Sequence, residues 1–200
     1  MRTHPPNAQL SSFILAQVPA GHIGYGVDIG ASDGVSINTT YMLEFAHRWN
    51  IISVEANPDY KGVLSARRAF VESCAVDWKA ADSMVLHVNT DNPEAYSALR
   101  PQKARAGDVT WKTHTVPVKT VDDILAKWEF PRLDLLCIDT EGTELDVLRG
   151  CDMEKWKPRV VIVEQWESPG PCTTYLQNLG YQATYHSAHN DCFVLQETTP

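Results

Sequence analysis

Apolar runs and amphipathic stretches alternate along most of this chain. The runs at residues 51–54, 135–138 and 160–163 are apolar at nearly every position, not at every second one. Such runs are typical of strands that are buried on both faces, as in a parallel sheet covered by helices. The pattern predicts strands at Tyr25–Ile29, Ile51–Glu55, Val71–Val76, Val85–Val88, Leu133–Asp139 and Val160–Glu164.

Helix-compatible stretches separate several of these strands. After the last of them, residues 175–195 have the pattern of a helix, a turn at Gly180 and a closing pair of strands. Alternating strands and helices form right-handed βαβ units. We therefore expect an α/β protein with a doubly wound, Rossmann-like fold, whose sheet is mostly parallel with an antiparallel edge. The predicted helices lie at Ala8–Val18, Ser36–Trp49, Tyr60–Ala69, Val121–Trp128 and Glu144–Leu148, and the closing strands at Tyr181–Tyr185 and Cys192–Leu195.

A chain of 200 residues fits one compact domain. We expect residues 1–200 to form a single domain, with residues 1–22 as an N-terminal helical extension. Residues 89–110 break the alternation, because they combine prolines, many polar residues and a cluster of basic residues. This segment is predicted to be an irregular excursion between two strands, which serves either as a substrate lid or as a plain surface loop.

Charge and composition argue against several classes of protein. The net charge of −8 disfavours a nucleic-acid partner, since phosphate binding requires a basic surface. No apolar run approaches the ~20 residues of a membrane span, and the N-terminus lacks the clear basic region of a signal peptide. The five cysteines show no C-x-x-C spacing, so we expect reduced thiols rather than a disulfide framework or a zinc site. We therefore predict a cytoplasmic protein without nucleic-acid or membrane partners, and leave its oligomeric state open.

The first predicted strand ends in a glycine turn with the pattern D-x-G-x-x-x-G, which runs from Asp28 to Gly34. Glycine allows the backbone to approach a ligand closely. Dinucleotide-binding folds have G-x-G-x-x-G at this point, and the carboxylates of Asp28 and Asp33 would repel a pyrophosphate. They would not repel a cationic nucleoside without phosphates, such as S-adenosylmethionine. The turn therefore favours a methyltransferase, with Gly30, Ser32 and Gly34 packed against the cofactor.

Ligands of open α/β sheets bind beyond the carboxyl ends of the strands, so the residues that follow each strand are the first candidates. Glu55 and Ala56 end the second predicted strand, where an acid can accept hydrogen bonds from both ribose hydroxyls. Alternatively, Glu55 is only a solvated strand end. Cys74 and Ala75, near the end of the third strand, are weaker candidates to flank the adenine, because a simple turn explains them equally well.

Carboxylates gather after the strand predicted at Leu133–Asp139. Asp139 and Glu141 are two positions apart and would share a face in an extended backbone. Their mutual repulsion calls for a cation, which can be the sulfonium and amino group of the cofactor, a divalent metal, or a proton taken from a substrate hydroxyl. Glu164 would project into the same crevice. Glu144 either shares this role or simply begins a helix, where an acid suits the macrodipole.

His186 and His189 lie close together in the last predicted loop. A histidine there could act as a general base, since imidazole titrates near neutrality. It could also bind a metal together with Asp139 or Glu164. Such loops are more often solvated, so we predict no resident metal and name Asp139, Glu164 and His189 as the candidates if one binds.

The order and spacing of several sequence blocks are more specific than any block alone. The blocks are Val27–Gly34 (VDIGASDG), Val54–Pro58 (VEANP), Val116–Leu125 (VPVKTVDDIL), Ile138–Gly150 (IDTEGTELDVLRG) and Val161–Glu164 (VIVE). Over about Gly26 to Leu195, the chain resembles the FkbM family of S-adenosylmethionine-dependent methyltransferases. The resemblance implies a class I methyltransferase fold and methyl transfer, usually to an oxygen of a sugar, polyketide or other small metabolite. Two departures, Ser32 for the commoner Asn and Ala56 for the commoner Pro, remove no cofactor-binding carboxylate.

We therefore expect an enzyme that transfers a methyl group from S-adenosylmethionine to a hydroxyl of a sugar, a glycan or another small molecule. Asp28 and Asp33 would orient the methionine end of the cofactor, which Asp139 would also contact. Asp139, Glu141 or one of the two histidines would remove the hydroxyl proton. Two other functions stay open: a metal-dependent hydrolase that uses the Asp139, Glu141 and Glu164 carboxylates, and a non-catalytic nucleoside-binding module.

Overall fold

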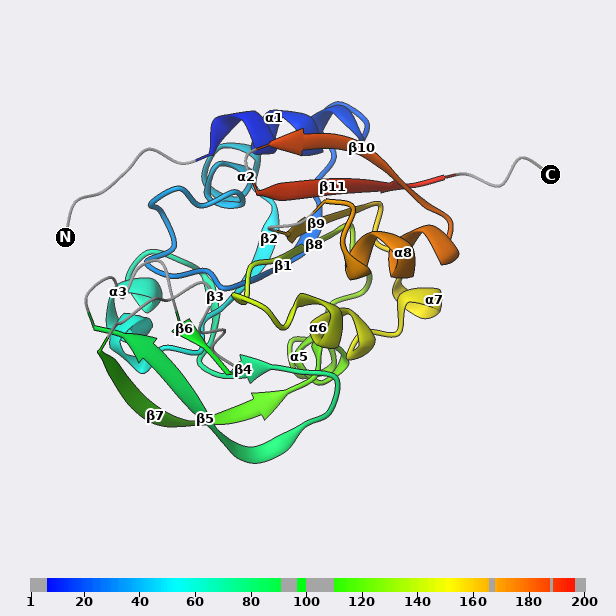
Figure 1. Ribbon diagram of the computed structural model, residues 1–200. Helices are drawn as coiled ribbons and strands as arrows, with labels where there is room; N and C mark the ends of the chain where they lie inside the picture. The colour runs from blue at the N-terminus through cyan, green and yellow to red at the C-terminus, as the bar shows by residue number, and fades with distance from the viewer. Residues whose placement is uncertain (1–6, 91–96, 100–109, 166–167, 188, 197–200) are drawn as a thin grey trace.

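A computed structural model describes residues 7–90, 97–99, 110–165, 168–187 and 189–196. Within these ranges the chain forms two sheets, with helices packed on both faces of the larger one (Figure 1). None of the helices in these ranges has the length and apolar character needed to cross a membrane. The expected α/β fold class is confirmed.

The larger sheet has seven strands, which are, in spatial order, β10 (Tyr181–Ser187), β11 (Asn190–Leu195), β9 (Val160–Glu164), β8 (Leu135–Ile138), β1 (Tyr25–Ile29), β2 (Asn50–Val54) and β3 (Phe70–Glu72). From β9 to β3 all neighbours are parallel. β11 runs antiparallel to both β9 and β10, and β10 forms the edge. A mostly parallel sheet with an antiparallel edge is the arrangement that the sequence predicted.

Each face of this sheet carries its own hydrophobic core, because successive strand residues point to opposite faces. In β8, Leu135 and Cys137 pack on one face, whereas Leu136 and Ile138 pack on the other. This is why the run at 135–138 is apolar throughout. The helices of the first face are α1 (Ala8–Ala16) and α2 (Tyr41–His47), and those of the second are α5 (Val121–Lys127), α6 (Glu144–Arg149), α7 (Met153–Trp156) and α8 (Pro171–Asn178).

The smaller sheet was not predicted. It has four strands, in the order β4 (Ala75–Val76), β7 (Trp111–Lys119), β5 (Ala81–Asn89) and β6 (Ser97–Ala98), and lies on the side of α3 (Lys61–Ser65) in Figure 1. The single strand predicted at Val71–Val76 is therefore wrong, because its first part, β3, lies in the larger sheet and its second part, β4, in the smaller one. The inner side of this sheet has a core of Ala75, Leu86, Val88, Val116 and Val118.

Strand β7 was not predicted, because it contains Pro117, and proline is typical of edges and bulges rather than of strand interiors. The structure accommodates Pro117 through an irregular pairing with β5. Ala81 pairs with Val118 and Met84 with Val116, so two residues of β5 face the single Pro117. Such a bulge removes the need for a backbone donor at the proline.

The helix predicted at Ser36–Trp49 is shorter than expected, since α2 begins only at Tyr41. Side chains in the preceding loop take over the backbone donors. Asp33 accepts from two N–H groups at 2.8 and 2.7 Å, and Asn38 accepts from two others at 3.0 and 2.9 Å. Ile37 also has a φ of +56°, which a helix does not allow.

The excursion predicted at residues 89–110 lies largely outside the described residues, as do its basic residues Arg100, Lys103 and Arg105. Its two ends are close, because the N–H of Thr90 donates to the carbonyl of Thr110 at 2.9 Å. Part of it, β6, pairs with β5. A role of this segment as a lid stays a prediction.

Glu72, at the end of β3, gives an expected pH dependence of stability. This buried carboxylate accepts hydrogen bonds from Lys119 at 2.9 Å, from the Trp128 indole at 2.8 Å and from Lys127. Burial alone would raise its pKa, but the hydrogen bonds from Lys127 and Lys119 outweigh this and hold the pKa below its usual value. The unfolded chain therefore binds this proton more readily. The stabilisation is present above about pH 4.5 and is lost as the pH falls through the lower folded pKa.

We expect Glu72→Gln to lower the free energy of unfolding by about 1–3 kcal/mol at pH 7, because two lysines lose their carboxylate. The difference from the unsubstituted protein should shrink as the pH falls below about 4.5. Urea denaturation at pH 7 and at pH 3 measures both values. A difference that is the same at the two pH values would contradict this assignment.

Candidate active site

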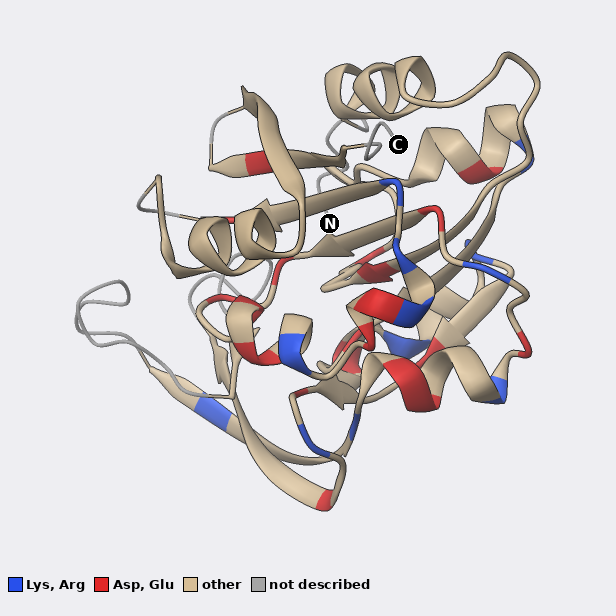
Figure 2. Ribbon diagram, turned by 90° about the vertical axis from the view of Figure 1, so that its right-hand side faces the viewer, with Lys and Arg blue, Asp and Glu red and all other residues tan. Residues whose placement is uncertain are grey.

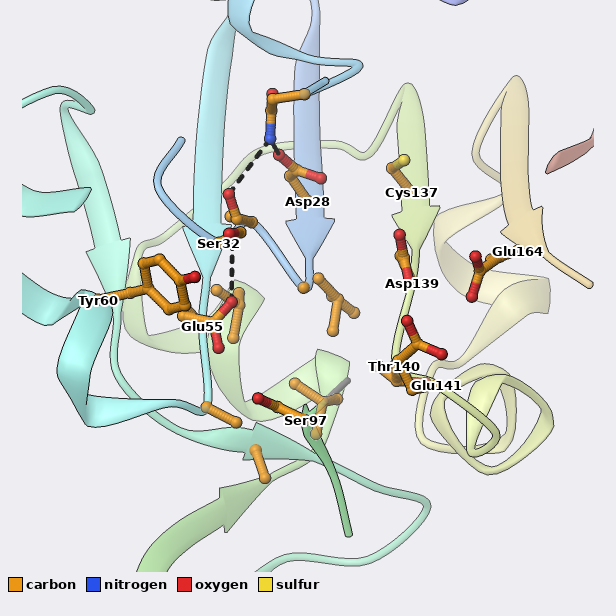
Figure 3. Close-up of a pocket in the computed structure, with 18 of the residues that line it drawn as sticks. Asp28, Ser32, Glu55, Tyr60, Ser97, Cys137, Asp139, Thr140, Glu141 and Glu164 are labelled. Atoms are coloured by element: carbon orange, nitrogen blue, oxygen red, sulfur yellow. Dashed lines mark hydrogen bonds between the residues drawn. The ribbon is translucent and has the colours of Figure 1, made fainter. Parts of the chain in front are cut away.

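A pocket of about 400 Å³ opens at the carboxyl ends of β1, β2, β8 and β9 (Figure 3). β2 and β3 lie on one side of β1 and β8 and β9 on the other, so the chain order reverses at this point. Open α/β sheets bind their ligands at such a switch point. The volume falls within the roughly 300–1,000 Å³ of small-molecule sites. The pocket lies where the sequence predicted it.

The glycine turn after β1 forms one wall of the pocket. Gly30, Ser32 and Gly34 all have left-handed backbones, with φ of +87°, +51° and +79°. Gly30 and Ser32 line the pocket, whereas Gly34, which was predicted to pack against the cofactor, is absent from the described lining, and a Cβ there would meet the side chains of Leu64 and Arg68. The N–H groups of Gly30 and the next residue donate to the carbonyl of Val54 at 2.9 and 3.0 Å, which ties the turn to the end of β2. A Cβ on Gly30 would lie 1.9 Å from the carbonyl oxygen of Asp139. Glycine is therefore required here by the contact between two turns of the protein itself.

Asp33 is engaged by the turn rather than presented openly to a ligand. It accepts from the hydroxyl of Ser36 at 2.8 Å and from Arg67 at 2.7 Å, besides its two backbone donors. Burial tends to raise its pKa, but these hydrogen bonds together hold it below the usual value. Asp28 also has an arginine nearby, Arg68 at 3.9 Å. Both acids have an arginine close by, so they would repel an anionic ligand less strongly than the sequence argument assumed. Their contact with the methionine end of a cofactor stays a prediction.

Glu55 is nearly buried, at 8% exposed, and both of its oxygens are held by backbone donors. Oε2 accepts from the N–H of Ser32 at 2.7 Å, and Oε1 from the N–H of Asn57 at 2.7 Å. Burial raises the pKa of Glu55, although these N–H groups oppose the rise. Each carboxylate oxygen can accept a second hydrogen bond. The residue is therefore fixed in place and still able to accept from two hydroxyl groups of a ligand.

The side of the pocket beyond Glu55 is mostly apolar. Cys74, Ala75 and Ala56 line it, as predicted, and burial raises the pKa of the Cys74 thiol to about 12, so it stays neutral. Sequence reasoning missed the other residues on this side. They are Tyr60, Val76, Leu86, Ser97 and Leu99. The last four lie in the smaller sheet or directly after one of its strands; the sequence predicted strands over Val76 and Leu86, but not the sheet that brings these residues to the pocket.

The opposite side of the pocket holds Asp139, Glu141 and Glu164 (Figure 3). One carboxylate oxygen of each lies within 4.8 Å of the others. The predicted clustering is therefore confirmed, but not its backbone reason. β8 ends at Ile138, and a turn in which Glu141 has a φ of +58° brings the side chains together, instead of an extended strand.

Asp139 is exposed in the pocket, where it lies among other acids. The surrounding protein limits the hydration of its carboxylate and, together with the charges of Glu164 and Glu141, raises its pKa above the usual value. A carboxylate whose pKa is raised is a stronger base than an ordinary one, which suits it to accept a proton.

Glu144 serves the turn and does begin a helix. Its Oε1 accepts from the N–H groups of Thr140 and Gly142 at 3.2 and 2.8 Å, and it is the first residue of α6. It shapes the segment that carries Asp139 and Glu141. This favours the alternative in which Glu144 begins a helix and takes no part in the chemistry.

The structure does not bring the two histidines into the site. Neither His186 nor His189 lines the described part of the pocket, whereas their neighbour Asn190 does. His186 lies on β10 with its Nδ1 2.6 Å from Asp191, and its side chain is 54% exposed. His189 is also absent from the group of carboxylates close enough to share a cation among the described residues. Their predicted role as general base or metal ligand therefore finds no support in this arrangement.

Fold and pocket together define a class I methyltransferase fold: a mostly parallel sheet, a glycine turn after its first strand and an acid after its second. The description "Methyltransferase FkbM domain" applies to the family whose sequence profile matches residues 28–183. The chain therefore belongs to the FkbM family of methyltransferases, and the resemblance noted in its sequence is confirmed.

Individual relatives are longer than the matched region. Methyltransferase sdnD of Sordaria araneosa is 42% identical over 65 residues, which cover 28% of this chain and 25% of that protein. The crystal structure of methyltransferase FkbM from Methylobacillus flagellatus KT has a TM-score of 0.60 at 16% identity, and covers 96% of this chain and 48% of its own. The N-terminal domain of human METTL16 in complex with SAH has a TM-score of 0.47 at 14% identity, and covers 94% of this chain and 68% of its own. The chain thus spans about a quarter of the curated relative and half of the solved FkbM structure.

Proposed function

We propose that this protein transfers a methyl group from S-adenosylmethionine to a hydroxyl oxygen of a sugar or another small metabolite. The observation that carries the proposal is Glu55, held by two backbone N–H groups at the end of β2, directly beside the glycine turn. The family adds support, since the chain belongs to the FkbM methyltransferases.

The residues of the pocket fit the cofactor. The volume of about 400 Å³ suits a nucleoside with an amino-acid tail. Glu55 offers acceptors for the ribose hydroxyls, and the apolar side around Cys74 and Leu86 offers a slot for a flat base. Asp28 and Asp139 lie on the other side of Glu55, where a cationic tail would meet negative charge.

The protein's own residues would act mainly by positioning and by proton transfer. The cofactor supplies, when bound, a methyl group on a good leaving group. The turn at Gly30 and the carboxylate of Glu55 hold the nucleoside, so that an acceptor oxygen in the pocket can be aligned. Asp139, with Glu141 and Glu164 beside it, accepts the proton of the acceptor hydroxyl.

We also propose that residues 1–200 form one domain that works in the cytoplasm on a small molecule or glycan with a hydroxyl group, without nucleic acid. All five cysteines are free and buried, as in a reducing compartment. Across the described part of the chain, Lys and Arg are scattered among Asp and Glu (Figure 2). In this part of the chain, the mixture of charges differs from the basic stripe that is typical of a nucleic-acid binder.

Glu55→Gln is expected to weaken binding of S-adenosylhomocysteine by about 10–100-fold. The amide turns an N–H₂ group toward one of the two backbone donors and weakens the acceptor for the ribose. Isothermal titration calorimetry measures the affinity. Glu72→Gln is the matched control, because Glu72 is also a buried glutamate at the end of a strand of the larger sheet but does not line the described pocket. It should bind with unchanged affinity despite its lower stability.

Equal affinities for Glu55→Gln and the unsubstituted protein would contradict the cofactor assignment. Tight S-adenosylhomocysteine binding without methyl transfer to any hydroxylated acceptor would favour the non-catalytic nucleoside-binding module. Binding of Mg²⁺ or Mn²⁺ without any heat from S-adenosylhomocysteine would favour the metal-dependent hydrolase, since three carboxylates lie close enough to share a cation.

A further inference from the structure

A buried arginine, Arg68, is bonded to the loop that follows the cofactor turn. Its side chain is 0% exposed. Its guanidinium group donates to Glu44 at 2.5 Å, to the carbonyl of Gly34 at 3.0 Å, to Asn38 Oδ1 at 3.1 Å and to the Thr40 hydroxyl at 2.8 Å. Four hydrogen bonds from one rigid, planar group fix the loop relative to that group.

These bonds determine which way the Asn38 amide points. Its Oδ1 accepts from Arg68 and from the backbone N–H groups of Thr40 and Tyr41, at 3.0 and 2.9 Å. All three partners are donors, so the oxygen must face them and the amide nitrogen must face away. That nitrogen donates to Asp28 Oδ2 at 2.8 Å.

The Thr40 hydroxyl is oriented in the same way. It accepts from Arg68, so its single proton is left to donate. Asn38 Oδ1, 3.1 Å away, already accepts three hydrogen bonds, whereas Asp28 Oδ2 lies at 2.7 Å. The proton therefore goes to Asp28. Two hydrogen bonds, each from a residue that Arg68 contacts, meet on one oxygen of this carboxylate.

The network acts on Asp28 from outside the pocket. Asp28 and Asn38 line the pocket, whereas Arg68 and Thr40 are absent from its described lining. The guanidinium of Arg68 makes its closer ion pair with Glu44, at 2.5 Å, and lies 3.9 Å from Asp28. Arg68 therefore compensates the negative charge of Asp28 only in part.

We propose that Arg68, acting through Thr40 and Asn38, is a positioning residue that fixes the Asp28 carboxylate for the ammonium-bearing tail of the cofactor. This role rests on the proposed function. Arg68 does not touch the ligand. It orients the two donors that hold one oxygen of Asp28, which leaves the other oxygen for the tail.

Two probes separate this role from a general effect on the fold. S-adenosylhomocysteine carries the amino-acid tail, whereas 5′-methylthioadenosine has the same nucleoside without it. Thr40→Val removes the hydroxyl and keeps the side-chain shape, and Arg68→Lys keeps the charge without the planar fork. Calorimetry should show S-adenosylhomocysteine affinity about tenfold weaker in each variant, and methylthioadenosine affinity within about twofold of the unsubstituted protein.

Arg67→Lys is the matched control, because Arg67 is the adjacent arginine and pairs with Asp33, whose carboxylate keeps three other donors from the turn when Arg67 changes. It should change neither affinity by more than about twofold. Equal weakening of both probes in Thr40→Val and Arg68→Lys would show a merely structural role and overturn the proposal, as would no weakening at all. If Arg68→Lys does not fold, Thr40→Val decides. Failure of the unsubstituted protein to bind either probe would instead overturn the proposed function, and the positioning role with it.

Discussion

Gly30→Ala is expected to lower the free energy of unfolding by at least about 3 kcal/mol, and to leave little folded protein if the parent is marginally stable. The new Cβ would lie 1.9 Å from the carbonyl oxygen of Asp139, which is backbone and cannot rotate away. The φ of +87° adds the strain of a left-handed residue, about 1–2 kcal/mol. The two turns would have to separate, and they carry Glu55's partner Ser32 and the acid Asp139. Urea denaturation measures the loss.

Gly180→Ala is the matched control for this prediction. Gly180 has nearly the same φ, +85°, but a Cβ there would meet nothing within 4 Å. We expect it to lose only about 1–2 kcal/mol, the backbone term alone. If the two substitutions destabilised the protein equally, the contact between the turns of Gly30 and Asp139 would not be the reason that residue 30 is glycine.

Asp139→Asn is expected to reduce methyl transfer by roughly 10²–10⁴-fold, because it removes the group proposed to accept the hydroxyl proton. The same substitution should stabilise the fold at neutral pH. In the folded protein, reduced hydration of the Asp139 carboxylate and the charges of Glu164 and Glu141 raise its pKa. The folded state therefore releases this proton at a higher pH than the unfolded chain does, and stability falls as the pH rises from the unfolded pKa toward the raised one. Asparagine has no proton to lose.

Urea denaturation should accordingly give Asp139→Asn a higher free energy of unfolding than the parent at pH 7, and a similar one at pH 3. Transfer of radiolabelled methyl from S-adenosylmethionine to a panel of hydroxylated small molecules gives the activity. Asp146→Asn is the control, since Asp146 lies on the neighbouring helix and pairs with the exposed Arg149. It should change stability by no more than about 0.5 kcal/mol and leave transfer intact. An Asp139→Asn protein that is less stable at pH 7, or as active as the parent, would contradict the proton-accepting role.

Much of the site could be predicted because strand ends are visible in the sequence. The buried runs in β1, β2, β8 and β9 show where parallel strands stop, and polar residues at those points must gather at one edge of the sheet. Glu55, Asp139 and Glu164 were found in this way. The positions of the two histidines could not be predicted in this way, because they lie in an antiparallel hairpin whose register no local pattern specifies. That register pairs His186 with Asp191 and keeps both histidines off the described pocket lining.

The class of fold and the acids at the strand ends could be predicted from local sequence, because burial on both faces and an abrupt change to polar residues are local properties. The contacts of those acids depend on how distant segments pack. The arginine partners of Asp28 and Asp33 come from residues more than thirty positions later, and Gly30 is fixed by a carbonyl over a hundred positions away. The smaller sheet, which adds Leu86, Ser97 and Leu99 to the pocket, depends on a bulge around Pro117. Contacts of this kind are set by the packing of distant segments, so no local pattern of apolar and polar residues encodes them.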